Sequence, residues 1–215
     1  DSLSSAPGSA ETTTLVRHIT RPLWLVESAG QVRVVDRLNS TTGSAADIRG
    51  FVPPFALESF GNSSFCHDHG LDYAYVGGSM AKGISSVAMV KAFGEAGMLG
   101  FFGAAGLSFE QVEAALDELQ QHRPAVPFGV NLIHSPSEPE LEKALVELYL
   151  RRGVQLIEAS AFLGLTLPLV RYRTHGIYRD DQGRIHAPNR IIAKVSREEV
   201  AGRFFAPPPE KLLRQ

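Results

Sequence analysis

Two polar side chains interrupt apolar segments of this sequence where chemistry could occur. Asn131 lies in the run 128–133 (FGVNLI), and Lys194 lies in the run 191–195 (IIAKV). A buried amide without partners costs about 1–3 kcal/mol, and a buried ammonium group needs an anion nearby. Asn131 is therefore either a structural hydrogen-bonding residue or a ligand contact. Lys194 either pairs with Glu158, at the end of the preceding predicted strand, or faces an anionic ligand such as a cofactor phosphate.

A glycine-rich segment, VGGSMAKG at 76–83, follows the first predicted strand of the main domain. Adjacent glycines let the backbone approach a flat ligand closely because no Cβ intervenes, but a tight turn with positive φ also needs glycine. The part GGSMA at 77–81 comes close to the G-x-S-x-G motif of α/β-hydrolases, with alanine in place of the last glycine. A hydrolase would also need an acid and a histidine downstream, and His134, His175 or His186 could be that histidine.

Two other patterns favour structural roles. Glycine recurs at every third position from Gly97 to Gly106, but the prolines of collagen and the G-K-[ST] of a phosphate-binding loop are absent there. We interpret this segment as a helix end, a strand and a tight turn. The triplet at 67–69 (HDH) resembles a metal-binding pair without a third ligand, so we interpret it as loop surface.

From Tyr73 onward, short apolar runs alternate with amphipathic helical patterns, which is typical of βαβ units and a parallel sheet. Ser108 and Gln111 can form a capping box, and Ser137 can cap a helix that has Pro139 in its first turn. The predicted strands are 73–77, 98–102, 128–133, 156–159 and 191–195, the predicted helices are 86–96, 108–121, 137–152 and 167–174, and 178–186 is a predicted hairpin.

Five strands within about 120 residues match the spacing of a (β/α)₈ barrel, which needs roughly 250 residues for all eight units. A doubly wound sheet would use similar units, but the sequence has no early G-x-G-x-x-G after a strand. We therefore predict an α/β fold with a partial (β/α)₈ barrel, about five units, over 73–215. Residues 22–72 are predicted to form a small β-hairpin, with strands 23–26 and 32–35, and an irregular segment. Residues 1–21 are predicted to be a disordered tail or linker because they are small and polar.

Composition narrows the functional class only broadly. The 215 residues are 44% hydrophobic and 20% charged with a formal net charge of -2, which is typical of a soluble globular protein. The chain is not basic and has no apolar run of roughly 18 to 20 residues, so we expect neither a nucleic-acid partner nor a membrane span. The single cysteine, Cys66, cannot form an internal disulfide, and no targeting signal opens the chain, which favours a cytoplasmic location. The start at Asp1, and a helical pattern that begins near 207 and is cut off at Gln215, indicate a piece of a longer protein.

From about Pro22 to the C-terminus, the chain resembles the trans-acting enoyl reductases of polyunsaturated fatty acid synthases and trans-acyltransferase polyketide synthases. These enzymes are themselves similar to the nitronate monooxygenase (2-nitropropane dioxygenase-like) flavoproteins. The segments that carry the resemblance are FCHDHGL, YAYVGGSMAKGISSVAMVKAFGEAGMLGFFGAAGLS, PFGVNLIHSPSEPELE, LYLRRGV, EASAFLGLTLPLVRYRTHGI and NRIIAKVSREEVAGRFFAPPPEKLL.

The resemblance implies an FMN-bound barrel that takes hydride from NADPH and passes it to the β-carbon of an enoyl thioester held on an acyl carrier protein. A lysine beside the flavin would favour the negative charge that develops on reduction. The residues that the match assigns to the flavin ring are Gly77, Gly78, Ser79 and Met80 in the first βα loop, Asn131 in the third strand and Lys194 in the fifth.

The sequence departs from the family pattern in one respect. The G-G-H-T-D-N-R-like stretch and the late strands, whose loops would bind the FMN phosphate, do not occur in it. We therefore expect this chain alone to bind FMN poorly and to need the rest of the barrel, from the same parent chain or from a second polypeptide. No catalytic residue is assigned, no metal is expected, and a homodimer is compatible with the sequence. The alternatives are a nitronate monooxygenase-like flavin oxidase and a non-catalytic docking fragment of a synthase.

Overall fold

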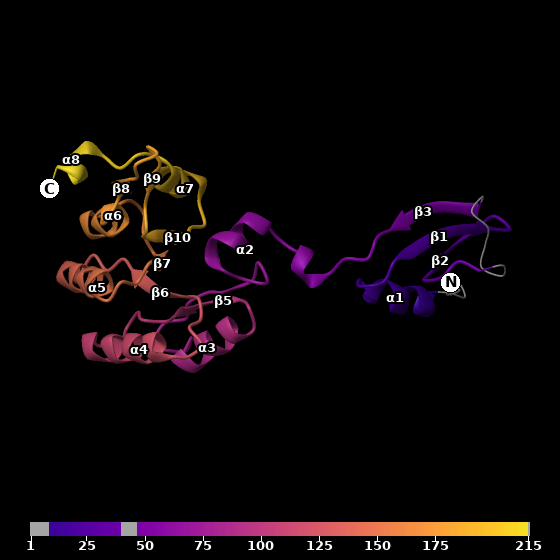
Figure 1. Cartoon of the computed structure of the whole chain (residues 1–215), viewed down its shortest axis with the longest axis horizontal. Coiled ribbons are helices and arrows are strands. Elements are labelled where there is room, and N and C mark those ends of the chain that lie inside the picture. Colours follow the sequence, from indigo (N-terminus) through magenta and orange to yellow (C-terminus); the bar gives the residue numbers. More distant parts are fainter. Residues whose placement is uncertain (1–8, 40–46, 215) are drawn as a thin grey trace, which may run out of the picture. The chain divides into compact units, whose positions relative to one another are not determined.

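The computed structural model describes residues 9–39 and 47–214 of the chain. The chain divides into two compact units, which meet in sequence between Phe60 and Gly61 (Figure 1). This division lies earlier than the expected change at 72. The reason is helix α2 (Ser63–His69), whose Phe65 and Cys66 pack against apolar residues of the second unit.

The first unit is a three-stranded antiparallel sheet with the order β2-β1-β3. Strands β1 (Leu23–Ser28) and β2 (Gln31–Val35) form the predicted hairpin. Its turn residues Ala29 and Gly30 have φ values of 52° and 73°, as a tight hairpin turn requires. Strand β3 (Ile48–Val52) falls in the segment that was expected to be irregular, and it pairs with β1.

Part of the expected tail is ordered. Helix α1 (Ser9–Arg17) contacts β2, and its Thr14 hydroxyl donates a hydrogen bond to the Ala10 carbonyl at 2.9 Å. A short polar helix is marginal by itself in water, so contact with the sheet supplies stability that the local sequence does not reveal. Residues 1–8, the beginning of the same predicted tail, lie outside the described residues.

The second unit contains a curled, all-parallel sheet with the order β10-β7-β6-β5-β4. Helices lie along its outer side (Figure 1). This arrangement is part of a (β/α)₈ barrel, as the sequence predicted. The first predicted strand is shorter than expected, because only two of its residues pair with β5. The strands are β4 (Val76–Gly77), β5 (Leu99–Phe102), β6 (Phe128–Ile133), β7 (Leu156–Ser160) and β10 (Arg190–Lys194).

The helices begin largely where capping residues predict. Ser86 caps α3, and Ser108 and Gln111 form the expected capping box of α4. Ser137 does not cap α5, whose N-cap residue is Glu138 without a side-chain bond. No helix in the described parts of the chain is long and apolar enough to cross a membrane. The remaining elements are α3 (Val87–Glu95), α4 (Phe109–Gln121), α5 (Pro139–Arg151), α6 (Leu167–Thr174), α7 (Glu198–Phe205), α8 (Glu210–Leu213), the 3₁₀ helix η2 (Leu57–Ser59) and the hairpin of β8 (Tyr178–Arg179) and β9 (Ile185–His186).

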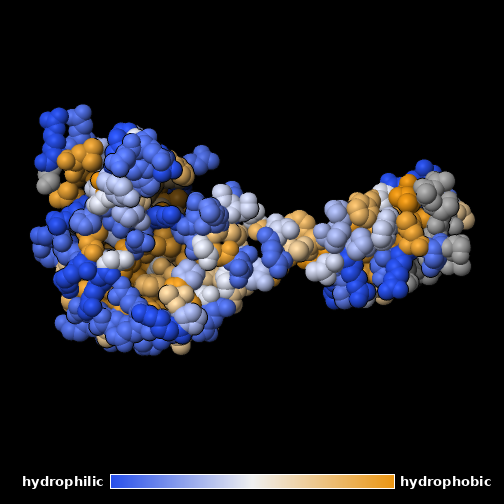
Figure 2. Space-filling view, viewed as in Figure 1, coloured by the Kyte–Doolittle hydropathy of each residue, from blue (hydrophilic) through white to orange (hydrophobic). Residues whose placement is uncertain are grey.

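Alternate residues of the barrel strands face opposite sides. Val130 and Leu132 of β6 belong to the main core between the sheet and its helices. Phe101 and Leu156 face the inner side, where they pack with Leu99 and the residues of α2. Hydrophobic residues are visible in the middle of this unit between hydrophilic ones (Figure 2). The inner side at the amino end of the strands is therefore closed by an apolar cluster.

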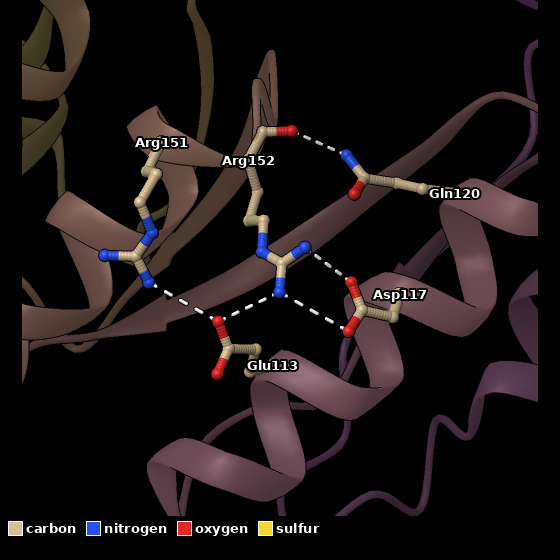
Figure 3. A network of polar contacts seen from close by, with 5 residues as sticks. All are labelled: Glu113, Asp117, Gln120, Arg151 and Arg152. Atoms are coloured by element: carbon tan, nitrogen blue, oxygen red, sulfur yellow. Dashed lines mark hydrogen bonds and ion pairs between the residues drawn. The ribbon is translucent and has the colours of Figure 1, made fainter.

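A charged network joins α4 to the end of α5 (Figure 3). The Arg152 guanidinium lies 2.9 Å from Glu113 and 2.6 Å from Asp117, while the Gln120 side chain donates to the Arg152 carbonyl at 2.6 Å. Arg151 adds a 3.4 Å contact to Glu113. Hydrogen bonding by Arg152 lowers the pKa of the Glu113 carboxyl. Because these side chains are partly exposed, we assign them a modest role in fixing where α5 ends.

Candidate active site at the carboxyl edge of the sheet

The inner side of the sheet becomes polar toward the carboxyl ends of its strands. Asn131 of β6 lies opposite Glu158 of β7, and Ser160 of β7 lies opposite Lys194 of β10. These four residues lie nearer the carboxyl ends of the strands than the apolar cluster that packs against α2. Barrel enzymes place their active sites at this end of the strands, where the βα loops converge.

Glu158 is at the centre of the polar group, with only 2% of its surface exposed. Its Oε2 accepts a hydrogen bond from the Ser79 amide at 2.7 Å, and its Oε1 lies 2.5 Å from Lys194 Nζ. Lys194 Nζ also donates to the Ser79 carbonyl at 3.2 Å. The structure thus joins the glycine-rich loop, β7 and β10 through one buried carboxylate. Lys194 pairs with Glu158, the protein partner considered from the sequence, but the buried charge of the pair is Glu158, because the Lys194 side chain is 53% exposed.

Asn131 makes hydrogen bonds within the protein through both its side chain and its backbone. Its Nδ2 donates to the Glu158 carbonyl at 3.2 Å and to Ser160 Oγ at 2.9 Å, and its own carbonyl accepts from the Tyr149 hydroxyl at 2.9 Å. Burial raises the pKa of Tyr149, so its hydroxyl remains a donor. Both amide hydrogens of Asn131 are used, and Oδ1 is therefore the atom that it can offer to a ligand.

The two glycines of the loop face different surroundings. A Cβ on Gly77 would lie 2.7 Å from the Phe93 ring of α3, so glycine is needed there for helix packing. A Cβ on Gly78 would lie 3.7 Å from Glu158 Oε2 and 3.9 Å from Lys194 Nζ, which are ordinary contacts. Of the two, Gly78 borders the polar group.

The Ser85 side chain holds the glycine-rich loop through two hydrogen bonds to its backbone. Its Oγ accepts from the Met80 amide at 2.8 Å and donates to the Gly78 carbonyl at 3.1 Å, and the residue is 1% exposed. The Met80 side chain is partly exposed, and the Met80 carbonyl lies so close to Gly103 that a Cβ there would collide with it. The sequence gives no signal for Ser85, because a serine next to the helix cap Ser86 has no distinctive pattern.

His134, one of the histidines considered for a hydrolase, contacts Glu142 and Phe162 instead of Ser79. Its Nδ1 lies 2.8 Å from Glu142 Oε2, its ring stacks on Phe162 at 5.0 Å between centroids, and the Thr166 hydroxyl donates to Glu142 Oε1 at 2.5 Å. The contacts of Ser79 with Glu158 and Lys194 are made by its backbone. These contacts give no support to the serine-histidine pair of a hydrolase.

Other histidine side chains make separate contacts. His67 and His69 belong to α2 instead of a loop, and burial, followed by the charge of Arg190, lowers the pKa of His69. His186 lies 2.8 Å from Asp180 within the β8–β9 hairpin. Among residues 9–39 and 47–214, no group of three or more histidine, cysteine or acidic residues could hold a metal ion.

Comparison with known proteins shows that the chain is similar to biosynthetic proteins, although no family model matches it. The chain is 42% identical over 192 residues, 89% of its length, to one of the subunits of the polyunsaturated fatty acid synthase of Thraustochytrium sp.. It is 44% identical over 159 residues, 74% of its length, to the polyketide biosynthesis protein PksE of Bacillus subtilis. These matches span 13% and 21% of the two relatives.

A solved structure also matches most of the chain. The crystal structure of the enoyl reductase domain of MlnA, from the macrolactin biosynthesis cluster of Bacillus amyloliquefaciens, is similar with a TM-score of 0.70 and 42% sequence identity. The match covers 74% of this chain and 36% of that chain. The chain is therefore similar to a part of each of these proteins, and it spans well under two thirds of their length.

Proposed function

We propose that the protein to which this chain belongs is an enoyl reductase of polyunsaturated fatty acid or polyketide biosynthesis. It reduces an enoyl thioester on an acyl carrier protein with NADPH through FMN, in the cytoplasm. The observation that carries the proposal is the polar group around Glu158, at the carboxyl edge of a half-barrel that is 42% identical to an enoyl reductase domain.

The residues present fit the ring of a flavin. Gly78 leaves the inner side of the loop free of a side chain, and the Lys194 side chain is 53% exposed, so its ammonium group is accessible to an anionic ligand. Asn131 can offer Oδ1 to a ring N–H, while Ser85 and Glu158 hold the loop in place. When bound, FMN would supply hydride transfer between NADPH and the substrate. Gly77, which packs on Phe93, has a structural role in this arrangement.

The remaining strands of the barrel would continue from β10. Within the described parts of the chain, this strand is hydrogen-bonded to β7 alone, so its other edge offers backbone groups for a further strand. A mainly apolar pocket of about 280 Å³ lies beside it, between α6 and α7. Its lining includes Leu169, Val170, Ile191, Ala193 and Phe204. We propose that the rest of the barrel, from the same parent chain or a second polypeptide, covers this edge and supplies the phosphate-binding loops.

The test is to purify the full-length protein and record its absorption spectrum, followed by NADPH oxidation assays. We expect a bound flavin, and NADPH consumption with a crotonyl thioester on an acyl carrier protein. Oxygen-dependent turnover of a nitronate without thioester reduction would indicate a flavin oxidase instead. A colourless full-length protein that binds the carrier protein would indicate a docking role.

A further inference from the structure

We propose that Glu158 is a positioning residue that sets the electrostatic potential felt by the flavin, by neutralising Lys194 and by holding the glycine-rich loop. This inference rests on the proposed function. Glu158 extends from β7 between two segments far from it in sequence, and the pair Ser79–Glu158 is separated by 79 residues. It therefore belongs to no local motif.

Because Glu158 is buried, its carboxylate needs partners inside the protein. Its side chain is 3% exposed, whereas that of Lys194 is 53% exposed. A carboxylate removed from water is strongly unfavourable unless a cation and hydrogen-bond donors replace the solvent. Lys194 Nζ at 2.5 Å and the Ser79 amide at 2.7 Å are those partners.

The pairing changes what Lys194 can do for a ligand. An isolated lysine would stabilise the anionic reduced flavin and raise its reduction potential. With a carboxylate 2.5 Å away, the two charges largely cancel at the distance of a neighbouring ring. The pair therefore presents polar groups with almost no net charge to the cofactor. The negative charge of Glu158 lowers the flavin reduction potential, and the positive charge of Lys194 raises it.

Glu158 also couples this charge balance to the shape of the loop. Its Oε2 holds the Ser79 amide, and Lys194 Nζ, fixed on Oε1, donates to the Ser79 carbonyl. Ser79 is thus clamped through both of its backbone polar groups by the same ion pair. A glutamine at position 158 keeps an acceptor for the amide while removing the negative charge.

The experiment measures flavin reduction potentials in the full-length protein for four forms: wild type, Glu158→Gln, Lys194→Met and the double variant. We expect Glu158→Gln to raise the potential, Lys194→Met to lower it, and the double variant to return close to wild type. Glu142→Gln is the matched control, because it removes another buried carboxylate, 3% exposed, that pairs with His134 instead of Lys194. It is expected to leave the potential unchanged.

A second measurement does not need the cofactor. In flavin-free protein, Lys194→Met should lower the melting temperature more than the double variant does, because it alone leaves a buried carboxylate without its cation. Potential shifts of the same sign in the two single variants, or none, would overturn the inference while leaving the proposed function standing. A full-length wild type without flavin would overturn the proposed function and this inference together.

Discussion

Replacing Tyr149 of α5 by phenylalanine should lower the stability of the chain and weaken the support of the candidate site. The Tyr149 hydroxyl is fully buried and donates to the Asn131 carbonyl at 2.9 Å. Its loss removes a hydrogen bond from a buried carbonyl, which costs about 1–3 kcal/mol of unfolding free energy. The carbonyl that Tyr149 binds belongs to Asn131, whose side chain donates to the Glu158 carbonyl and to Ser160 Oγ. We therefore also expect weaker flavin binding by the full-length protein.

Tyr172→Phe provides a matched control within the same unit. Tyr172 is equally buried, and its hydroxyl donates to the Val154 carbonyl at 2.8 Å, away from the polar group. It should lose similar stability, about 1–3 kcal/mol, without a change in flavin affinity. Urea unfolding should be followed by far-UV circular dichroism, because the single tryptophan, Trp24, lies in the other unit. Equal effects of both substitutions on flavin affinity would refute the assignment of Tyr149 to the site.

Two further outcomes are expected. Ser85→Ala should lower the free energy of unfolding by about 1–3 kcal/mol and weaken flavin binding, because it leaves the Met80 amide and the Gly78 carbonyl unpaired. Ser86→Ala should lower it by about 1 kcal/mol through a lost helix cap, without affecting flavin binding. Denaturant midpoints and flavin titrations check both substitutions. Hydrogen bonding by His186, and then by the Arg184 amide, lowers the pKa of Asp180 from 3.8, so its stabilisation of the β8–β9 hairpin is present above pH 3.8 and is lost as the pH falls through the folded-state pKa. Hydrogen-exchange protection factors should fall in that acid range in wild type and stay flat in Asp180→Asn; a hairpin insensitive to acid in wild type would contradict this reasoning.

The sequence predicts the barrel elements well because their signals are local. The apolar run that holds Asn131 forms β6 with the expected bounds, and the helix at 167–174 is also confirmed. The capping box of Ser108 and Gln111 is another local pattern that survives folding. In each case neighbouring residues contain both the periodicity and the stop signal.

The elements that the sequence missed depend on distant contacts. Strand β3 exists because β1 offers it an edge, and α1 is held against β2. Helix α2 packs on Leu99 and Leu156, which come from strands farther along the chain. Short segments of this kind have weak propensities, and tertiary packing decides their conformation.

The candidate site divides in the same way. The sequence by itself identified the unusual residues, Asn131 and Lys194 inside apolar strands and the glycines of the loop, because polar groups and paired glycines are conspicuous in such runs. Only the tertiary structure decided how they are used: it paired Lys194 with Glu158, turned Gly77 toward helix packing and joined Lys194 to Ser79, 115 residues away. The physical reason is that a buried charge takes whichever partner the fold brings within reach, and sequence spacing does not encode that distance.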